Sequence, residues 1–222
     1  MERRLTAILI ADIVGFSRLM ANDEAGTYIA VKALWNEHFG FRVSEHRGRV
    51  VKLMGDGALV EFTSVVDAVG CAVAAQLDAT ERNTMMPAEK RIEMRIGINL
   101  GDIIIEGEDI YGDGVNVAAR MEKLAPPGGI ALSATAHEHV SGKIDIVFKD
   151  GGEHKLKNIA KPARVYLWTW DGSADYQPDI DDTKDTAGSG NTLPLPDTPS
   201  IAVLPFENIS GDPEQEYFAD GI

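Results

Sequence analysis

The sequence predicts an α+β fold built on a ferredoxin-like β-α-β-β-α-β core, with additional strands and a helix attached. Two observations support this prediction. Strand-like and helix-like segments follow one another in the order strand, helix, strand, strand, helix, strand, which is the pattern of such a split sheet. In addition, 44% of the 222 residues are hydrophobic, which suffices for a buried core and excludes general disorder.

The first strand and the first helical region occupy the start of the chain. Residues 4–12 (RLTAILIAD) form a short apolar run with β-branched side chains, which predicts a central strand. Basic residues precede this run, so the start mimics a signal peptide, but Asp12 interrupts the run too early for one. Residues 17–46 are predicted to be mostly helical, with a second helix restarting near Asn22.

A hairpin and a second helix follow. Residues 49–54 and 58–62 are two short predicted strands, and the Gly55-Asp56-Gly57 sequence between them predicts a tight turn because glycine adopts positive φ. Ser64 is expected to cap the next helix, with Asp67 as the acidic residue of a capping box.

The remaining elements extend this core. Residues 92–105 are strand-like, with a break or bulge expected at Gly101 and Asp102, and residues 114–124 are predicted to be helical. The last expected elements are a strand at 130–132, a helix from Ser133, and strands near 144–149 and 163–170.

Charge divides the chain into segments. The net charge is -14, but residues 1–170 hold 23 acidic and 20 basic side chains, whereas residues 171–222 hold 12 and one. We therefore expect one nearly neutral domain (1–170), an acidic flexible linker (171–199), and the start of a second domain (200–222) that the chain cuts short. An acidic chain is not expected to bind nucleic acid or an anionic membrane, but a neutral domain can bind a nucleotide.

Other residue classes exclude further functions. The single cysteine, Cys71, excludes a disulfide framework and a thiolate zinc site, favours a cytoplasmic location, and is interpreted as a buried structural thiol. No stretch approaches the roughly 18 apolar residues of a membrane-spanning helix, so no membrane contact is expected from this portion. The five histidines are interpreted as structural or surface residues: His38, His46, His137, His139 and His154.

Two carboxylates stand out by position. Asp12 lies at the end of the first predicted strand, and Asp56 lies at the tip of the predicted hairpin. If the hairpin pairs beside that strand, the two carboxylates approach each other and repel unless a cation lies between them. Mg²⁺ is suited to such a place because it prefers oxygen ligands. The alternative is a turn aspartate and an unrelated strand-end cap.

A second candidate group lies in the predicted helix 114–124. Asn116 and Arg120 are four residues apart and share one face, whereas Val115 and Ala119 face elsewhere and can pack. An amide and a guanidinium on one face can hold a ribose and a phosphate. The alternative is a surface helix with ordinary polar residues.

Three separated motifs, in this order, resemble the catalytic domain of class III nucleotidyl cyclases, the adenylate and guanylate cyclases. They are ADIVGFS, VKLMGDG and DIYGDGVNVAARME, and the resemblance covers about residues 4–170. The GxxxxGK[ST] loop of P-loop nucleotidases does not occur in the sequence. The resemblance thus implies the class III cyclase fold, with Mg²⁺ or Mn²⁺ as cofactor at two ions per site.

The resemblance also implies a role for each matching residue. Asp12, Asp56 and the carbonyl of Ile13 would bind the metal ions, and the amides of Val14, Gly15 and Phe16 would cradle the triphosphate. Lys52 and Asp109 would recognise the base, Asn116 would orient the ribose, and Arg120 would stabilise the transition state. Without the neighbouring motif, Lys52 would be interpreted as a solvated strand lysine. The family often adds a basic residue that holds the β- and γ-phosphates. The candidates for this role are Lys155, Lys157, Lys161 and Arg164, and the alternative for most of them is a surface role.

The implied reaction converts ATP to 3′,5′-cyclic AMP and pyrophosphate in a homodimer whose sites are shared between chains. Lys52 and Asp109 favour adenine, because the ammonium group can donate to the ring nitrogen of adenine and the carboxylate can accept from its amine. The alternatives are a guanylate cyclase and a catalytically silent nucleotide-binding dimerisation module. A diguanylate-type cyclase is disfavoured because its GG[DE]EF turn is replaced by MGDGALVEF. Residues 200–222 (SIAVLPFENISGDPEQEYFADGI) resemble the opening of a TolB-like domain.

Overall fold

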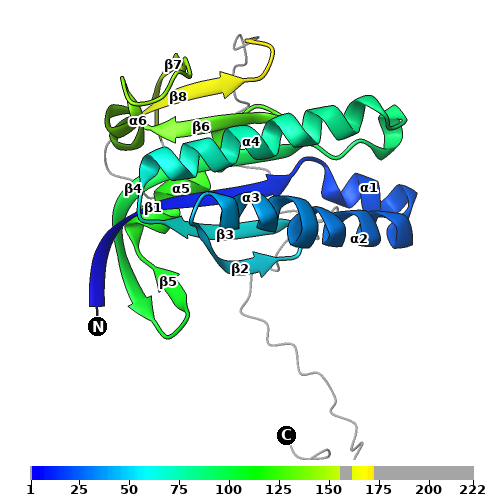
Figure 1. Cartoon of the computed structure of the whole chain (residues 1–222), viewed down its shortest axis with the longest axis horizontal. Coiled ribbons are helices and arrows are strands. Elements are labelled where there is room, and N and C mark those ends of the chain that lie inside the picture. The colour runs from blue at the N-terminus through cyan, green and yellow to red at the C-terminus, as the bar shows by residue number, and fades with distance from the viewer. Residues whose placement is uncertain (1, 156–161, 173–222) are drawn as a thin grey trace, which may run out of the picture. The chain divides into compact units, whose positions relative to one another are not determined.

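One mixed sheet organises the protein. The computed structural model describes residues 2–155 and 162–172. Their strands follow the order β2-β3-β1-β4-β6-β8-β7, with β5 paired to β4 outside this path (Figure 1). The strands are β1 (Glu2–Ile13), β2 (Arg49–Met54), β3 (Gly57–Phe62), β4 (Met94–Glu106), β5 (Asp109–Tyr111), β6 (Gly129–Ser133), β7 (Lys149–His154) and β8 (Ala163–Thr169).

The sheet order confirms the predicted fold class. Antiparallel pairing joins β2 to β3, β3 to β1 and β1 to β4, and this β2-β3-β1-β4 order is that of a ferredoxin-like core. Strands β6, β8 and β7 extend the sheet beyond β4, and β6 runs parallel to β4.

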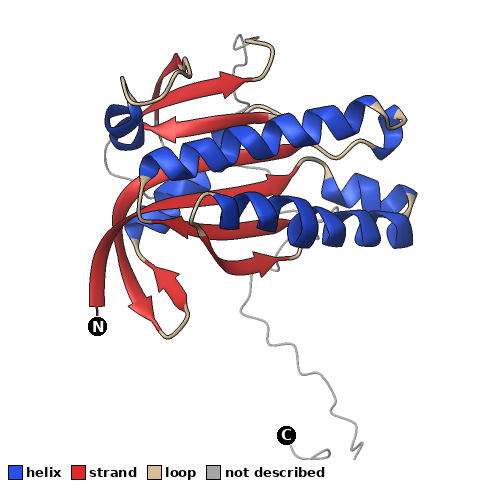
Figure 2. Cartoon of the chain, in the orientation of Figure 1, coloured by secondary structure: helices blue, strands red, loops and turns tan. Residues whose placement is uncertain are grey.

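Helices cover both faces of the sheet. Figures 1 and 2 show α4 and the α1–α3 region on one face and α5 on the other. The helices are α1 (Phe16–Asn22), α2 (Glu24–Ala33), the π-helical η1 (Leu34–Phe39), α3 (Gly40–Glu45), α4 (Val65–Thr84), the 3₁₀ turn η2 (Ala88–Lys90), α5 (Asp113–Leu124) and α6 (Ala134–Val140). None of the described helices is both long and apolar enough to cross a membrane.

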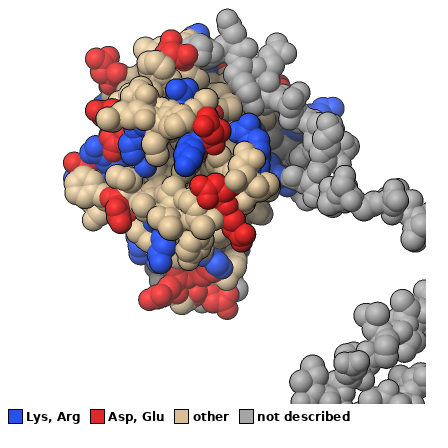
Figure 3. Space-filling view, turned by 90° about the vertical axis from the view of Figure 1, so that its right-hand side faces the viewer, with Lys and Arg blue, Asp and Glu red and all other residues tan. Residues whose placement is uncertain are grey.

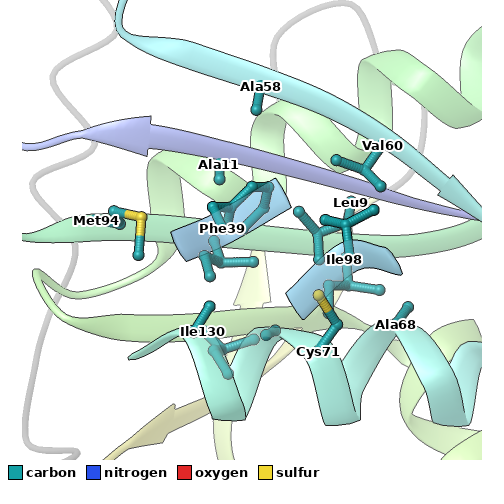
Figure 4. Packing of buried hydrophobic residues seen from close by; sticks show 14 of the residues in the cluster. Leu9, Ala11, Phe39, Ala58, Val60, Ala68, Cys71, Met94, Ile98 and Ile130 are labelled. Carbon is teal, nitrogen blue, oxygen red and sulfur yellow. The ribbon is translucent and has the colours of Figure 1, made fainter. Parts of the chain in front are cut away.

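The two faces of β1 carry two different cores. Leu9 and Ala11 contact the larger cluster, in which Phe39 and Cys71 come from the covering helices (Figure 4). Residues Ile8 and Ile10 point to the opposite face, into a smaller cluster shared with α5 and β5. This alternation is the period of two that a strand buried on both sides requires. Cys71 is fully buried, which confirms its structural interpretation, and burial raises the pKa of its thiol to about 12.

Several expected boundaries are confirmed. The helical region restarts after Asp23, whose carboxylate accepts a hydrogen bond from the N–H of Gly26. Ser64 caps α4 by accepting from the N–H of Asp67. The Asp67 carboxylate does not complete a capping box, because it binds the guanidinium of Arg47 instead.

Two expectations about strands are wrong. The break expected at Gly101 and Asp102 does not occur, because β4 pairs with β1 without a register shift through these residues. Gly101 is needed for another reason: a Cβ there would lie 3.0 Å from the Cα of Gly114, so the glycine allows α5 to approach the sheet. The strand expected at 144–149 lies at β7 instead, while Ile144, Ile146 and Phe148 pack against the larger core without strand pairing.

The short strand β5 is not predicted from the sequence, and the expected linker and second domain lie almost wholly outside the described residues. Strand β5 has three residues and forms a hairpin with the end of β4. Of the segments expected at 171–199 and 200–222, only Asp171 and Gly172 lie within the described residues. Acidic and basic side chains are interspersed over one face of the described part, in agreement with a nearly neutral domain (Figure 3).

Candidate active site

The first group of predicted site residues lies where β1 ends beside the β2–β3 hairpin. Asp12 pairs through its Cα with Gly57 of β3. Asp56 lies in the turn, and its carbonyl accepts a hydrogen bond of 3.1 Å from the N–H of Ile13. The turn depends on Gly55, whose φ of 68° is rare for any residue with a side chain. The hairpin therefore brings Asp12 and Asp56 together at one end of the sheet.

The electrostatics of this pair fit a divalent cation. Burial, followed by repulsion from Asp56, raises the pKa of Asp12 from 3.8 to about 6, although Arg95 and Lys123 oppose the shift. A cation between the two carboxylates would remove this repulsion, and carboxylate oxygens are ligands that Mg²⁺ prefers. No cluster of three or more His, Cys, Asp or Glu side chains forms a metal site in the described ranges. An ion here would therefore depend on Asp12, Asp56, backbone oxygen and the substrate's own phosphates.

Two further charged residues lie near this pair, and no local sequence pattern predicts them. Glu122 of α5 is only 8% exposed, and burial together with repulsion from Asp12 raises its pKa to about 7. Arg95 of β4 is the direct Cα partner of Asp12, and its Nε is buried without a hydrogen-bond partner within the described part. Glu122 follows Arg120 by two residues in the third motif, but helical spacing alone does not indicate that it faces β1.

The residues expected to cradle a triphosphate lie at the start of α1. Gly15 has a left-handed backbone, with φ 65°, and its carbonyl accepts from the N–H groups of Arg18 and Leu19. The N–H of Val14 donates to the carbonyl of Glu93 at 2.9 Å, so this amide is already engaged. The amides of Gly15 and Phe16 precede the first helical hydrogen bond and have no acceptor among the described residues. Of the three predicted amides, these two are therefore available to an anion.

The second group of predicted residues forms a polar pair between β2 and β5. The Nζ of Lys52 lies 3.0 Å from the Oδ2 of Asp109. The hydroxyl of Tyr111 donates to the same oxygen at 3.1 Å, and the N–H of Ile110 donates to the other at 3.0 Å. These contacts raise the pKa of Lys52 and lower that of Asp109, chiefly through their mutual hydrogen bond. A charged donor and a charged acceptor thus lie side by side, partly exposed.

A bulge in β2 makes this pairing possible. Arg49 pairs with Glu61 and Val50 with Val60, but Lys52 pairs with Leu59, so Val51 is an extra residue. In a regular strand, residues 49 and 52 would point to opposite faces. The bulge turns Lys52 to the same face as Arg49, and this is the face on which Ile110 of β5 packs.

Asn116 and Arg120 lie together on α5, as the helical spacing predicts. Asn116 is exposed and Arg120 is half-buried, whereas Val115 and Ala119 pack against the smaller core. Within the described residues, the guanidinium of Arg120 forms no hydrogen bond or ion pair, and none links Asn116 or Arg120 to the Asp12 carboxylate or to Lys52. The predicted site residues therefore form three groups on one chain.

The candidate phosphate-binding residues near the end of the domain differ in availability. Arg164 binds both carboxylate oxygens of Asp150, so its charge is already paired. Lys155 is exposed. Lys157 and Lys161 lie outside the described residues.

Comparison with known proteins identifies the family. The sequence model described as "Adenylate and Guanylate cyclase catalytic domain" matches residues 3–169. The chain belongs to this family.

Individual relatives agree with this assignment of the cyclase domain. "Putative adenylate cyclase 3" of Rhizobium meliloti (strain 1021) is 50% identical over 221 residues, which cover 100% of this chain and 36% of that protein. An "Adenylate cyclase" of Streptomyces coelicolor is 31% identical over 63% of this chain and 35% of its own length. The chain thus spans about a third of these relatives.

A solved structure shows the same fold. The "Adenylate/Guanylate Cyclase/Hydrolase from Silicibacter pomeroyi" is 41% identical, with a TM-score of 0.72 over 76% of this chain and 98% of that one. The cyclase domain therefore has the mixed α+β architecture of this family, whose members generally depend on divalent metal ions.

Proposed function

We propose that this domain is an adenylate cyclase that converts ATP to 3′,5′-cyclic AMP and pyrophosphate. The observation that carries the proposal is the Lys52–Asp109 pair, which holds a donor and an acceptor 3.0 Å apart. Adenine offers a ring-nitrogen acceptor beside an amine donor, so Lys52 can donate to N1 while Asp109 accepts from N6. Guanine inverts this pattern and would leave both charged groups unpaired, at a cost of roughly 1–3 kcal/mol or more.

Each remaining group has a role in the reaction. Asp12, Asp56 and the carbonyl of Ile13 would hold two Mg²⁺ or Mn²⁺ ions, which when bound lower the pKa of the ribose 3′-hydroxyl and neutralise phosphate charge. The amides of Gly15 and Phe16 bind the triphosphate, with Val14 fixing the start of α1 through Glu93.

The residues of α5 act on the reacting end of the nucleotide. Asn116 orients the ribose so that its 3′-oxygen attacks the α-phosphorus in line, and pyrophosphate leaves as the 3′-proton is lost. Arg120 donates to the phosphoryl oxygens on which charge accumulates. Its lack of a partner among the described residues leaves its donors free for this purpose.

We infer further that the site is shared between two chains of a homodimer. The Asp12–Asp56 pair, the Lys52–Asp109 pair and Arg120 share no hydrogen bond or ion pair in the described part of the chain, as expected if a partner chain completes each site. The edge strand β2 is also suited to a partner, because Leu53 and Met54 are 44% and 45% exposed. Two-fold pairing would create two equivalent sites.

Two of the relatives have names that specify adenylate cyclase, which supports adenine as the base. We propose that residues 171–199 are a linker, that residues 200–222 begin a TolB-like domain, and that the protein is cytoplasmic.

A direct assay tests the function. The purified chain is incubated with ATP or GTP and with Mg²⁺ or Mn²⁺, and cyclic products are measured by chromatography. Cyclic AMP should predominate and should disappear in Asp12→Ala. Cyclic GMP as the main product would favour the guanylate cyclase instead. A verified dimer that binds nucleotide but forms neither product would be a silent module.

A further inference from the structure

The hairpin that carries Asp109 needs more than strand pairing to reach β2. Strand β5 pairs only with β4 among the described strands, through Glu106↔Asp109, Ile105↔Ile110 and Ile104↔Tyr111. Strand β2 lies at the sheet edge and is separated from β4 by two strands, β3 and β1. The distance between Lys52 and Asp109 therefore depends on contacts between side chains of β2 and the β4–β5 turn.

Arg49 provides such a contact from β2. Its Nη1 donates to the carbonyl of Glu108, the residue before Asp109, at 2.9 Å. Its Nε donates to the Oε1 of Glu61 on β3 at 2.8 Å. One guanidinium thus connects the sheet to the turn that carries the base-reading carboxylate.

Glu61 is a buried acceptor for this guanidinium. It is only 9% exposed, lies directly opposite Arg49, and accepts a second hydrogen bond of 2.8 Å from the Nη2 of Arg4 on β1. Burial alone would raise the pKa of Glu61, but the hydrogen bonds from Arg49 and Arg4 outweigh it and keep the pKa below its ordinary value. The carboxylate is therefore charged at neutral pH and holds Arg49 through a charge-assisted hydrogen bond.

Substrate binding makes this connection more important. When a base binds, Lys52 and Asp109 form hydrogen bonds with the base in place of their hydrogen bond to each other. The Arg49–Glu108 contact then remains as the polar link between β2 and the β4–β5 turn in the described structure. This link therefore determines where Asp109 lies relative to Lys52 once the base is bound.

We propose that Arg49 is a positioning residue for base selection, which holds Asp109 opposite Lys52 by bridging Glu61 and the Glu108 carbonyl. This inference rests on the proposed function. Arg49 acts on nucleotide binding through Asp109 and does not touch the reacting atoms. Its loss should therefore weaken ground-state and transition-state binding alike, which raises KM and leaves kcat unchanged.

Steady-state kinetics with ATP and GTP test the proposal. For Arg49→Ala, we expect KM for ATP to rise about tenfold and the ratio of kcat/KM for ATP over GTP to fall about tenfold, with kcat for ATP within about twofold of wild type. Arg49→Lys should show the same changes and remain folded, because an ammonium retains the charge beside Glu61 but cannot fork to both acceptors. Lys52→Ala shows how much preference for ATP over GTP remains when the base-reading pair is destroyed.

Hydrogen exchange gives a second readout that does not depend on activity. In the nucleotide-free chain, the amides of residues 108–111 should exchange faster in both Arg49 variants than in wild type. Arg47→Ala is the matched control, since Arg47 forms a forked ion pair with Asp67 outside the proposed site. It should alter neither the nucleotide ratio nor exchange at 108–111.

The outcomes separate this inference from the proposed function. Unchanged KM and nucleotide ratio in a folded Arg49→Lys chain, or equal changes in Arg47→Ala, would overturn the positioning role. If wild type cyclises neither nucleotide, the proposed function fails, and the positioning role is then decided by Kd for ATP and GTP together with exchange. In that case, Arg49→Lys must still lower the ratio of the Kd for GTP to the Kd for ATP. A wild type that binds neither nucleotide refutes both the proposed function and the positioning role.

Discussion

The side chain of Asp12 combines burial with a neighbouring carboxylate, and this combination has a measurable consequence. Burial and Asp56 raise its pKa to about 6 in the folded chain. A group whose pKa is raised by folding stabilises the fold when protonated, and this contribution is lost as the pH rises through the folded value. Asp12 should therefore destabilise the metal-free protein increasingly between about pH 4 and pH 7.

Thermal unfolding in the presence of a chelator tests this consequence. The melting temperature of wild type should fall more steeply from pH 5 to pH 7.5 than that of Asp12→Asn, in which the charge cannot form. Saturating Mn²⁺ at pH 7.5 should raise the melting temperature of wild type but not of Asp12→Asn. Asp145→Asn, at an exposed loop position, should leave the slope unchanged. Parallel slopes for wild type and Asp12→Asn would contradict the electrostatic account.

Substitution of Arg120 tests the role of a single side chain in the reaction. Arg120→Ala removes a guanidinium with no hydrogen bond or ion pair in the described structure, so folding should be little affected. Loss of a donor aimed at transition-state charge costs on the order of 10²–10³ in kcat. The measurement is kcat at saturating ATP, with circular dichroism as the folding control. A change in KM alone would assign Arg120 to substrate binding.

The sequence indicates residue types at this site more reliably than their contacts. Asp12, Asp56, Asn116 and Arg120 lie where strand ends, a hairpin and helical spacing place them. Glu122 was missed because its approach to Asp12 depends on how α5 packs on the sheet, which no local pattern specifies.

At the level of elements, the turn at Gly55-Asp56 and the N-cap at Ser64 are predicted correctly, whereas the capping box at Asp67 and the strand register are not. The hairpin at Gly55-Asp56 and the start of α4 after Ser64 follow from local backbone chemistry and are confirmed. The bulge at Val51 and the strand β7 depend on which neighbour each strand meets, so the alternation of residues along the chain does not reveal them. The bulge matters most, since it turns Lys52 toward β5.

The packing of α5 against β4 depends on Gly97. A Cβ on Gly97 would lie 2.0 Å from the backbone nitrogen of Glu122 and 2.5 Å from the carbonyl of Ala118. These are backbone atoms, so in Gly97→Ala the helix must move away from the sheet. We expect a loss of about 2–3 kcal/mol in the free energy of unfolding and a lower kcat, because Arg120 moves with α5.

Denaturant unfolding and the cyclase assay measure the two effects. Gly142→Ala is the control, since a Cβ there meets nothing within 4 Å and only its φ of 72° is unfavourable. It should cost about 1 kcal/mol and leave kcat unchanged. Full activity in Gly97→Ala would show that the position of α5 is not important for catalysis.

At the level of the whole molecule, the net charge of -14 is a poor guide to the ligand. Most of it lies beyond residue 170, and both signs are interspersed over the visible face of the domain (Figure 3). A single chain also does not unite all the predicted site residues by contact, because neither Arg120 nor the Lys52–Asp109 pair is hydrogen-bonded or ion-paired to the Asp12–Asp56 pair in the described structure. Function is therefore expected to depend on assembly.

Complementation tests this dependence on assembly. Asp12→Ala and Arg120→Ala chains are each expected to be inactive, but a mixed dimer contains one site with an intact carboxylate pair and an intact Arg120. Random exchange makes half of the dimers mixed, each with one of two sites restored, so activity should return to about a quarter of wild type. Mixing Asp12→Ala with Asp56→Ala should restore nothing, because both defects lie in the same half-site and every site retains one. If co-purification of two differently tagged chains shows mixed dimers and the first mixture remains inactive, the two half-sites do not belong to different chains. If the second mixture regains activity, the two aspartates do not act together on one chain.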